Sequence, residues 1–187
     1  MNCELILGGA RSGKSRHAQY LAQETGWGVT VIATATADDA EMAERIHRHR
    51  AERPVNWHTH EEPTALATAL RQTAAPEHCI IVDCITLWLT NLLKGAEHLP
   101  APTNPHTLHH LQAEYDALLT LLPTLPGKII LVANELGLGI VPDTPLGRLF
   151  RDEAGRLNQA LATCCTRVTF IAAGLPFILK DSTSHPV

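Results

Sequence analysis

The feature that most constrains this chain is a glycine-rich segment that begins at its eighth residue. It reads GGARSGKS and fulfils the pattern G-x-x-x-x-G-K-[ST] of a phosphate-binding loop. Its members are Gly8, Gly9, Ala10, Arg11, Ser12, Gly13, Lys14 and Ser15. An apolar segment, 4–7, precedes the loop and a helix-compatible segment, 14–24, follows it, as the motif requires. A chance match in a glycine-rich turn is the weaker explanation, so we expect the chain to bind a nucleoside triphosphate.

Each part of the loop has a chemical purpose. The glycines let successive backbone N–H groups point at phosphate oxygens, and the following helix adds the positive end of its dipole. Lys14 is expected to reach the β- and γ-phosphates, and Ser15 to give its hydroxyl to Mg²⁺. The segment 79–83 reads CIIVD, an apolar strand that ends in an aspartate. Asp83 is therefore a second predicted Mg²⁺ ligand, with a turn-forming aspartate as the alternative.

Apolar, strand-like runs alternate with helical ones along the chain. The predicted strands are 4–7, 29–34, 79–83, 128–133 and 167–172, with a weaker candidate at 55–59. The predicted helices are 14–24, 38–50, 63–73, 87–93, 105–122 and 145–163. Continuous apolar strands separated by helices are typical of a mainly parallel sheet with helices on both faces. We expect a single α/β domain over residues 1–187, a length that suits one core.

Composition argues against several classes of function. The formal net charge is −4 and the chain has no basic stripe, so nucleic acid is not an expected partner. No run of about 18 apolar residues predicts a membrane span. The first residues lead directly into a strand, so we expect no signal peptide. The five cysteines lack C-x-x-C spacing and are read as small buried hydrophobes.

The eleven histidines raise the question of a metal site. The clustered ones are His58, His60, His106, His109 and His110. They lack cysteine, aspartate or glutamate partners at metal-ligand spacing. We therefore expect them to be solvated.

The helix predicted after the second strand carries a histidine between two arginines. Arg45, His49 and Arg53 lie four residues apart and so share one helical face. Arg48 instead lies four residues from a glutamate on either side, and His47 shares its face with alanines. A neutral imidazole can attack an α-phosphorus, and flanking guanidinium groups stabilise the developing charge. An exposed basic helix with i,i+4 ion pairs is the alternative interpretation.

Five ordered blocks of the chain resemble one family. They read GGARSGKSR, DDAEMAERIHRHRAERP, VDCITLWLTNLL, NELGLGIVP and GRLFRDEAGRLNQ. They resemble the bifunctional adenosylcobinamide kinase and adenosylcobinamide-phosphate guanylyltransferase of adenosylcobalamin biosynthesis. The resemblance covers nearly the whole chain, and it is poorest over 95–122 and in the tail. It implies a RecA-like P-loop core and a cytoplasmic homotrimer.

The resemblance implies two reactions at one nucleotide site. The γ-phosphoryl group of ATP or GTP is first transferred to the hydroxyl of the aminopropanol arm of adenosylcobinamide. GTP then guanylylates a histidine, pyrophosphate leaves, and the GMP passes to the phosphorylated corrinoid. The motif R-I-x-x-H places that histidine at His49, with His47 as the less favoured alternative, and Lys14 is the other catalytic residue. Further nucleotide contacts implied by position are Ala33, Thr34, Ala35, Arg50, Ala51, Glu52, Arg53, Glu61 and Asp83.

Two other functions stay open at this point. One is a simple P-loop kinase for a small molecule, in which His49 only clamps a phosphate. The other is a RecA-like NTPase module that acts on a macromolecule. Ala33–Ala35 can also be a plain strand end, and the polar loop after Asn134 either contacts substrate or is a tight structural turn.

Overall fold

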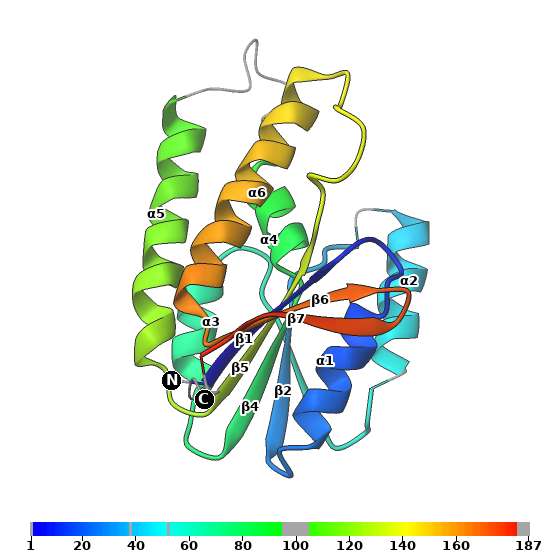
Figure 1. Cartoon of the computed structure of the whole chain (residues 1–187), viewed down its shortest axis with the longest axis vertical. Coiled ribbons are helices and arrows are strands. Elements are labelled where there is room, and N and C mark those ends of the chain that lie inside the picture. The colour runs from blue at the N-terminus through cyan, green and yellow to red at the C-terminus, as the bar shows by residue number, and fades with distance from the viewer. Residues whose placement is uncertain (1, 38, 52, 95–104, 183–187) are drawn as a thin grey trace.

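The computed structural model describes residues 2–37, 39–51, 53–94 and 105–182 (Figure 1). These residues form a seven-stranded sheet in the order β3-β2-β4-β5-β1-β6-β7. The strands are β1 (Asn2–Gly8), β2 (Gly28–Ala33), β3 (His58–Glu61), β4 (His78–Asp83), β5 (Lys128–Asn134), β6 (Arg167–Ala172) and β7 (Leu175–Asp181). Neighbouring strands are parallel except β6 and β7. The predicted mainly parallel α/β sheet is therefore confirmed.

Side chains of the central strands alternate between two cores, one on each face of the sheet. Ile6 of β1 packs with Ala18 and Ala22, whereas Leu5 and Leu7 lie in the opposite, larger core. Figure 1 shows α1 on one side of the sheet and α3 to α6 on the other. The helices are α1 (Lys14–Gln23), α2 (Ala40–Ala51), α3 (Leu66–Thr73), α4 (Ile85–Leu92), α5 (Pro105–Leu121), the 3₁₀ turn η2 (Leu122–Thr124) and α6 (Pro145–Cys164).

The five main predicted strands and the six predicted helices are confirmed, with shifted ends. The helix predicted over 63–73 begins only at Leu66, because Glu62 Oε1 accepts hydrogen bonds from the backbone N–H groups of Thr64 and Ala65 at 2.9 and 2.7 Å. That side chain stabilises a turn in place of the first helical residues.

The weak strand candidate at 55–59 is wrong in its position. Residues 54–57 form a turn in which the N–H of Trp57 donates to the carbonyl of Pro54 at 3.0 Å, and β3 covers His58–Glu61 instead. The strand β7 is absent from the sequence prediction. It reads LPFILKD, and its interior proline argues against a strand. Pro176 is tolerated because β7 is the edge strand of the sheet.

The cysteines were expected to be buried and the clustered histidines to be solvated, and each expectation holds for only some of these residues. Three of the cysteines are buried, and Cys84 and Cys164 are half-buried. Among the clustered histidines His58, His109 and His110 are exposed, whereas His60 is half-buried. The side chain of His106 lies outside the described residues. Within the described ranges, none of the helices combines the length and apolar character needed to cross a bilayer.

Gly127, directly before β5, occupies a position where a side chain would collide with backbone. Its φ is +76°, and a Cβ would lie 2.3 Å from the carbonyl oxygen of His78 and 2.5 Å from that of Ala75. We expect Gly127→Ala to lower the free energy of unfolding by about 3 kcal/mol in urea denaturation, because both neighbours are fixed by the fold. Gly26→Ala is the matched control.

At Gly26 φ is +66°, but an added Cβ would have no heavy atom within 4 Å beyond its own chain neighbours. Only the left-handed backbone strain remains there, about 1 kcal/mol. Equal losses in the two variants would contradict the steric explanation for Gly127.

Candidate active site

The phosphate-binding loop joins β1 to α1 at the carboxyl edge of the sheet, where ligands bind in open α/β folds. Two neighbouring segments hold it in place: the N–H of Glu135 donates to the carbonyl of Gly8 at 3.0 Å, and that of Gly174 to the carbonyl of Ser12 at 2.8 Å. A Cβ on Gly8 would lie 2.4 Å from the carbonyl oxygen of Ile171, so only glycine permits this close packing.

The loop has the features of an anion cradle. The N-cap residue of α1, Gly13, supplies no side-chain acceptor for the first N–H groups of that helix. Ser12 Oγ is buried without a hydrogen-bond partner among the described residues. Lys14 is only 8% exposed and donates from Nζ to the carbonyl of Gly9 at 2.6 Å. Phosphate oxygens fit such a site, because they accept hydrogen bonds from amide, hydroxyl and ammonium groups.

A cleft of about 1200 Å³ opens beside this loop. It is lined by most residues predicted from the sequence: Ala10, Arg11, Ser12, Gly13, Lys14, Ser15, Ala33, Ala35, His49, Arg50, Arg53, Glu61 and Asp83. They come from the ends of β1, β2, β3 and β4 and from α2, so segments that are far apart in the sequence converge on one space. Their contacts with nucleotide stay predictions.

One face of α2 borders this cleft. Met42, Ile46 and His49 line it, at the helical spacing i, i+4 and i+7. Arg53 also lines the cleft, but it lies beyond the end of α2 at Ala51. His49 therefore shares its wall with apolar side chains toward the start of α2 and with arginines toward its end. The prediction that Arg53 shares a helical face with His49 is wrong, because α2 ends at Ala51; the side chain of Arg45 lies outside the described residues.

The opposite face of α2 is solvated. Arg48 and Glu44 form an i,i+4 ion pair of 3.7 Å in which both side chains are about two-thirds exposed. This confirms one of the two ion pairs predicted for Arg48; the other involves Glu52, which lies outside the described residues. His47 is exposed and does not line the cleft. Of the two candidate nucleophiles, the structure places His49 at the cleft.

Two ion pairs attach the end of α2 to the sheet. Arg50 Nη1 lies 3.2 Å from Glu61 Oε1 at an exposed position. Arg53 is only 10% exposed; its Nη2 lies 3.9 Å from Asp83 Oδ2, and its Nη1 donates to Thr59 Oγ1 at 3.2 Å. Burial lowers the pKa of Arg53, and the carboxylate of Asp83 opposes that shift. Both arginines thus lie beside the acids that the family resemblance assigns to the nucleotide.

Some predicted residues do not line the cleft. Gly8 and Gly9 form the base of the loop, and Ala51 is exposed at the end of α2. Thr34 is fully buried: its Oγ1 donates to the carbonyl of Cys84 at 2.7 Å and accepts from the N–H of Cys84 at 2.9 Å. In this arrangement the Thr34 side chain anchors the fold and does not face a ligand.

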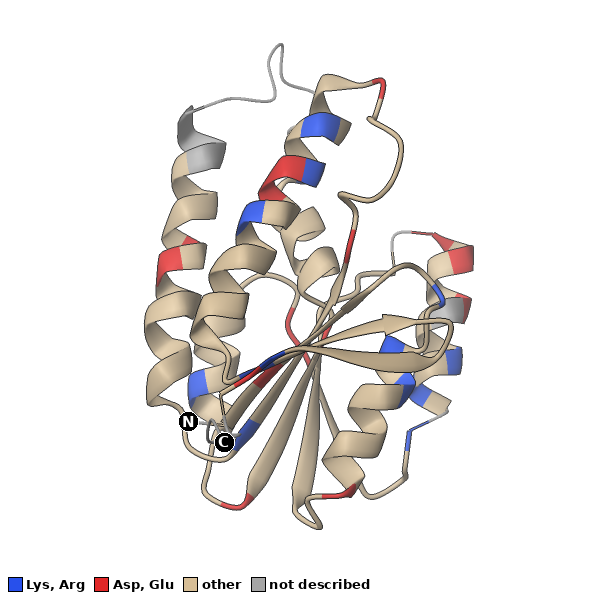
Figure 2. Cartoon of the chain, in the orientation of Figure 1, with Lys and Arg blue, Asp and Glu red and all other residues tan. Residues whose placement is uncertain are grey.

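Several lining residues were not predicted from the sequence. Arg16 and Gln19 lie one turn apart on α1 directly after the loop, and this helical spacing was the available signal. Ala173 and Gly174 form the turn between β6 and β7, and nothing local in the sequence indicates that it meets the loop. The lining has more basic than acidic residues, so the cleft is basic although the chain is acidic overall: Arg11, Lys14, Arg16, Arg50 and Arg53 against Glu61 and Asp83. Figure 2 shows basic residues along the ribbons of α1 and α2, together with acidic residues on α2.

The oxygen ligands that Mg²⁺ prefers are present at the cleft. Ser15 and Asp83 both line it, one from the phosphate loop and one from the end of β4. Mg²⁺ in phosphoryl-transfer sites is commonly held by one or two such groups together with phosphate oxygens and water. The pair fits this pattern.

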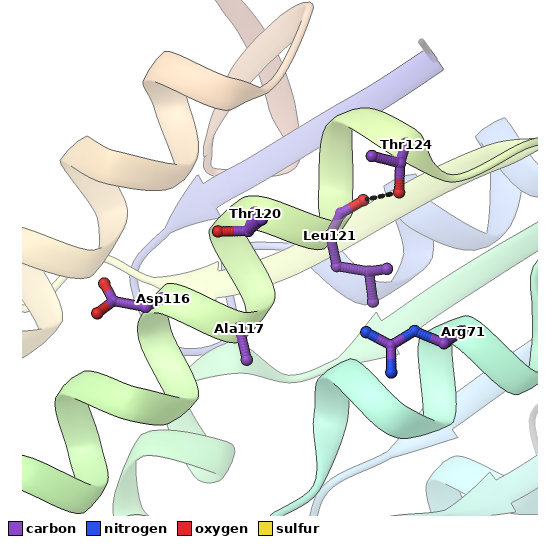
Figure 3. A pocket seen from close by; sticks show the side chains of 6 residues that line it. All are labelled: Arg71, Asp116, Ala117, Thr120, Leu121 and Thr124. Atoms are coloured by element: carbon purple, nitrogen blue, oxygen red, sulfur yellow. Dashed lines mark hydrogen bonds between the residues drawn. The ribbon is translucent and has the colours of Figure 1, made fainter.

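A second hollow of about 590 Å³ lies between α3 and α5 (Figure 3). Figure 3 shows Arg71 and Asp116 on its walls, and the hydroxyl of Thr124 donates to the carbonyl of Leu121 at 2.8 Å. It lies against the helical layer and has no glycine-rich loop. The cleft at the sheet edge is therefore the candidate active site.

Comparison with known proteins supports this assignment. Residues 4–179 match the family described as cobinamide kinase / cobinamide phosphate guanyltransferase. The chain belongs to this family. The chain is similar to the bifunctional adenosylcobalamin biosynthesis protein CobP of Pseudomonas aeruginosa, which is 55% identical over 177 residues, or 95% of this chain and 96% of that protein. The CobU protein of Salmonella typhimurium is 40% identical over 94% of this chain and 98% of its own length.

A solved structure supports the fold. An ATPase from the type III secretion system of pathogenic bacteria superimposes with a TM-score of 0.51 at 11% identity. The match covers 97% of this chain and 57% of the ATPase chain. At this identity the likeness concerns the RecA-like P-loop fold alone, and the family members carry the inference about chemistry.

Proposed function

We propose that this chain phosphorylates adenosylcobinamide and then converts the product to adenosylcobinamide-GDP through a guanylylated histidine. The observation that carries the proposal is the convergence of the phosphate loop and His49 on one cleft. Family membership supports both activities, and it favours them over a simple kinase or a macromolecule-directed NTPase.

In the kinase reaction the loop N–H groups and Lys14 hold the triphosphate of ATP or GTP. The hydroxyl oxygen of the corrinoid side arm attacks the γ-phosphorus, the bond to the β-phosphate oxygen breaks, and a nucleoside diphosphate leaves. Asp83 lies at the cleft where a carboxylate can hold the metal or take the hydroxyl proton. Mg²⁺, held by Ser15 and Asp83, would neutralise charge on the phosphates.

In the guanylyl transfer a nitrogen of His49 attacks the α-phosphorus of GTP. A P–N bond forms as the P–O bond to pyrophosphate breaks. A phosphate oxygen of the corrinoid then attacks the same phosphorus, which breaks the P–N bond and returns the imidazole. Arg50 and Arg53 border the cleft at the end of α2, where guanidinium groups stabilise charge on the phosphoryl oxygens.

The family resemblance also suggests a cytoplasmic homotrimer. The edge strand β7 supports self-association, because Leu175, Phe177, Ile178 and Leu179 are each more than half exposed. An uncovered apolar edge strand tends to pair with another chain. Sedimentation equilibrium measures the mass directly, and a purely monomeric protein at micromolar concentration would contradict the trimer.

Labelling with GTP tests the proposed function. The protein is incubated with Mg²⁺ and α-labelled GTP, and the expected product is a covalent label that acid removes and base does not, formed together with pyrophosphate. A second assay follows phosphate transfer to adenosylcobinamide. Phosphorylation without label or pyrophosphate would indicate a simple kinase, and hydrolysis stimulated by nucleic acid but indifferent to corrinoids would indicate an NTPase module.

A further inference from the structure

A side-chain amide on α4 joins two segments that form one wall of the cleft. Asn91 Nδ2 donates to the carbonyl oxygen of Thr34 at 2.7 Å and to that of Pro63 at 3.0 Å. Its Oδ1 accepts a hydrogen bond from the hydroxyl of Thr36 at 3.4 Å. Both N–H groups and the carbonyl oxygen of this half-buried amide are thus hydrogen-bonded to the segments that follow β2 and β3.

The segment after β2 is fixed at several points. The N–H of Thr34 donates to the carbonyl of Asp83 at 3.2 Å, and its hydroxyl bonds to the backbone of Cys84. Asn91 takes up the remaining polar group of Thr34, its carbonyl. The next residues, Ala35 and Thr36, line the cleft, so their position relative to the end of β4 depends on these bonds.

The segment after β3 carries the other part of this wall. Glu61 and Pro63 line the cleft, and the N–H of Glu62 donates to the carbonyl of Ala33 at 3.0 Å. The second N–H of Asn91 binds the carbonyl of Pro63. One amide therefore sets the spacing between Ala35 and Pro63 on the two segments.

This wall lies at the nucleoside end of the site. In the sheet, β4 and β5 separate β2 from β1, which at about 4.8 Å per strand puts the nearer segment of the wall, after β2, about 14 Å from the end of β1 where the phosphate loop begins. An extended triphosphate tail together with its ribose spans about this distance, so the nucleoside of a nucleotide held at the loop reaches the wall. The apolar side chains of Met42 and Ile46 line the same cleft from α2 and suit a purine ring.

We propose that Asn91 is a positioning residue for the nucleoside part of GTP. It does not line the cleft itself; it acts by holding Ala35, Thr36 and Pro63 at the separation that the ribose and base require. The inference rests on the proposed function, because GTP is the ligand that this function assigns to the cleft. The phosphate loop does not share the hydrogen bonds of Asn91, so binding of the triphosphate tail is independent of this amide.

The test compares equilibrium binding of GTP with binding of inorganic tripolyphosphate, both with Mg²⁺, by titration calorimetry. Asn91→Asp preserves size but turns the donors into acceptors that face two carbonyl groups. We expect it to weaken GTP binding about 10- to 100-fold, because two hydrogen bonds are lost and the wall segments separate. Tripolyphosphate binding should stay within about twofold of wild type.

Two further variants sharpen the result. Asn91→Gln retains the amide donors but places them one methylene further out, so we expect it to weaken GTP binding about 3- to 10-fold. This variant serves as the test if Asn91→Asp does not fold. Thr90→Val is the matched control on α4, because it removes only the bond from Thr90 Oγ1 to the carbonyl of Thr86 at 3.0 Å.

The outcomes separate the hypotheses. GTP affinity unchanged in folded Asn91→Gln and Asn91→Asp proteins, or an equal loss for GTP and tripolyphosphate, would overturn the positioning role and leave a purely structural one. A wild-type protein that binds GTP but never becomes labelled would sink the proposed guanylyl transfer, and it would leave the binding test of Asn91 intact.

Discussion

His49→Ala is expected to lower covalent labelling by α-labelled GTP at least about 10³-fold, because it removes the only nucleophile proposed for the P–N bond. Phosphorylation of adenosylcobinamide should stay within about threefold of wild type, since that transfer uses the loop and not the imidazole. The measurement is the initial rate of each reaction on the same preparation. This split between two activities is the strongest signature of the proposed mechanism.

His47→Ala is the matched control for this variant. It changes the same residue type on the same helix, but His47 is exposed and does not line the cleft, so both rates should resemble those of wild type. Labelling that persists in His49→Ala and disappears in His47→Ala would assign the nucleophile to His47. Labelling that persists in both would remove histidine catalysis from the proposal.

Lys14→Met is expected to lower both activities, by about 10²- to 10⁴-fold each, because both reactions use the same triphosphate cradle. Lys14 is nearly buried within the loop, and the methionine retains its apolar stem but not the charge that faces the phosphates. Loss of the bond to the Gly9 carbonyl should cost stability only modestly, about 1 kcal/mol. Steady-state rates and a thermal melt on each preparation separate the two effects.

Lys128→Met controls for the loss of a positive charge as such. Lys128 begins β5, at the end of that strand opposite to the cleft, and it does not line the site. Its variant should keep both activities. If Lys14→Met retained one activity at the wild-type level, the two reactions would not share the loop, and the single-site mechanism would be wrong.

Local patterns in the sequence predicted the parts of this site that lie within single segments. The loop 8–15 is recognised from neighbouring residues alone, because its glycines, lysine and serine follow one another in a short motif. Asp83 follows from the apolar strand that precedes it. His49 follows from helical spacing and from the family resemblance, and the structure places it on the cleft face of α2.

Other features depend on contacts between distant segments. Spacing grouped His49 with Arg45 and Arg53, but it could not show that Met42 and Ile46 share the cleft wall, since which face of α2 meets the sheet depends on packing. Position in the family motif assigns Thr34 to the nucleotide, yet its hydroxyl is buried against Cys84, fifty residues later in the chain. The strand β7 escapes prediction because its proline is permitted only at the sheet edge.

The phosphate loop, the alternation of strands and helices, and the residue types available for chemistry can be read from the sequence, because they follow from short-range periodicity and local backbone preferences. Which of these parts meet depends on the folded chain. The order β3-β2-β4-β5-β1 places the ends of five strands along one edge, and the amide of Asn91 ties two of the following segments together. Such convergence depends on packing across the whole sheet, which no local pattern encodes.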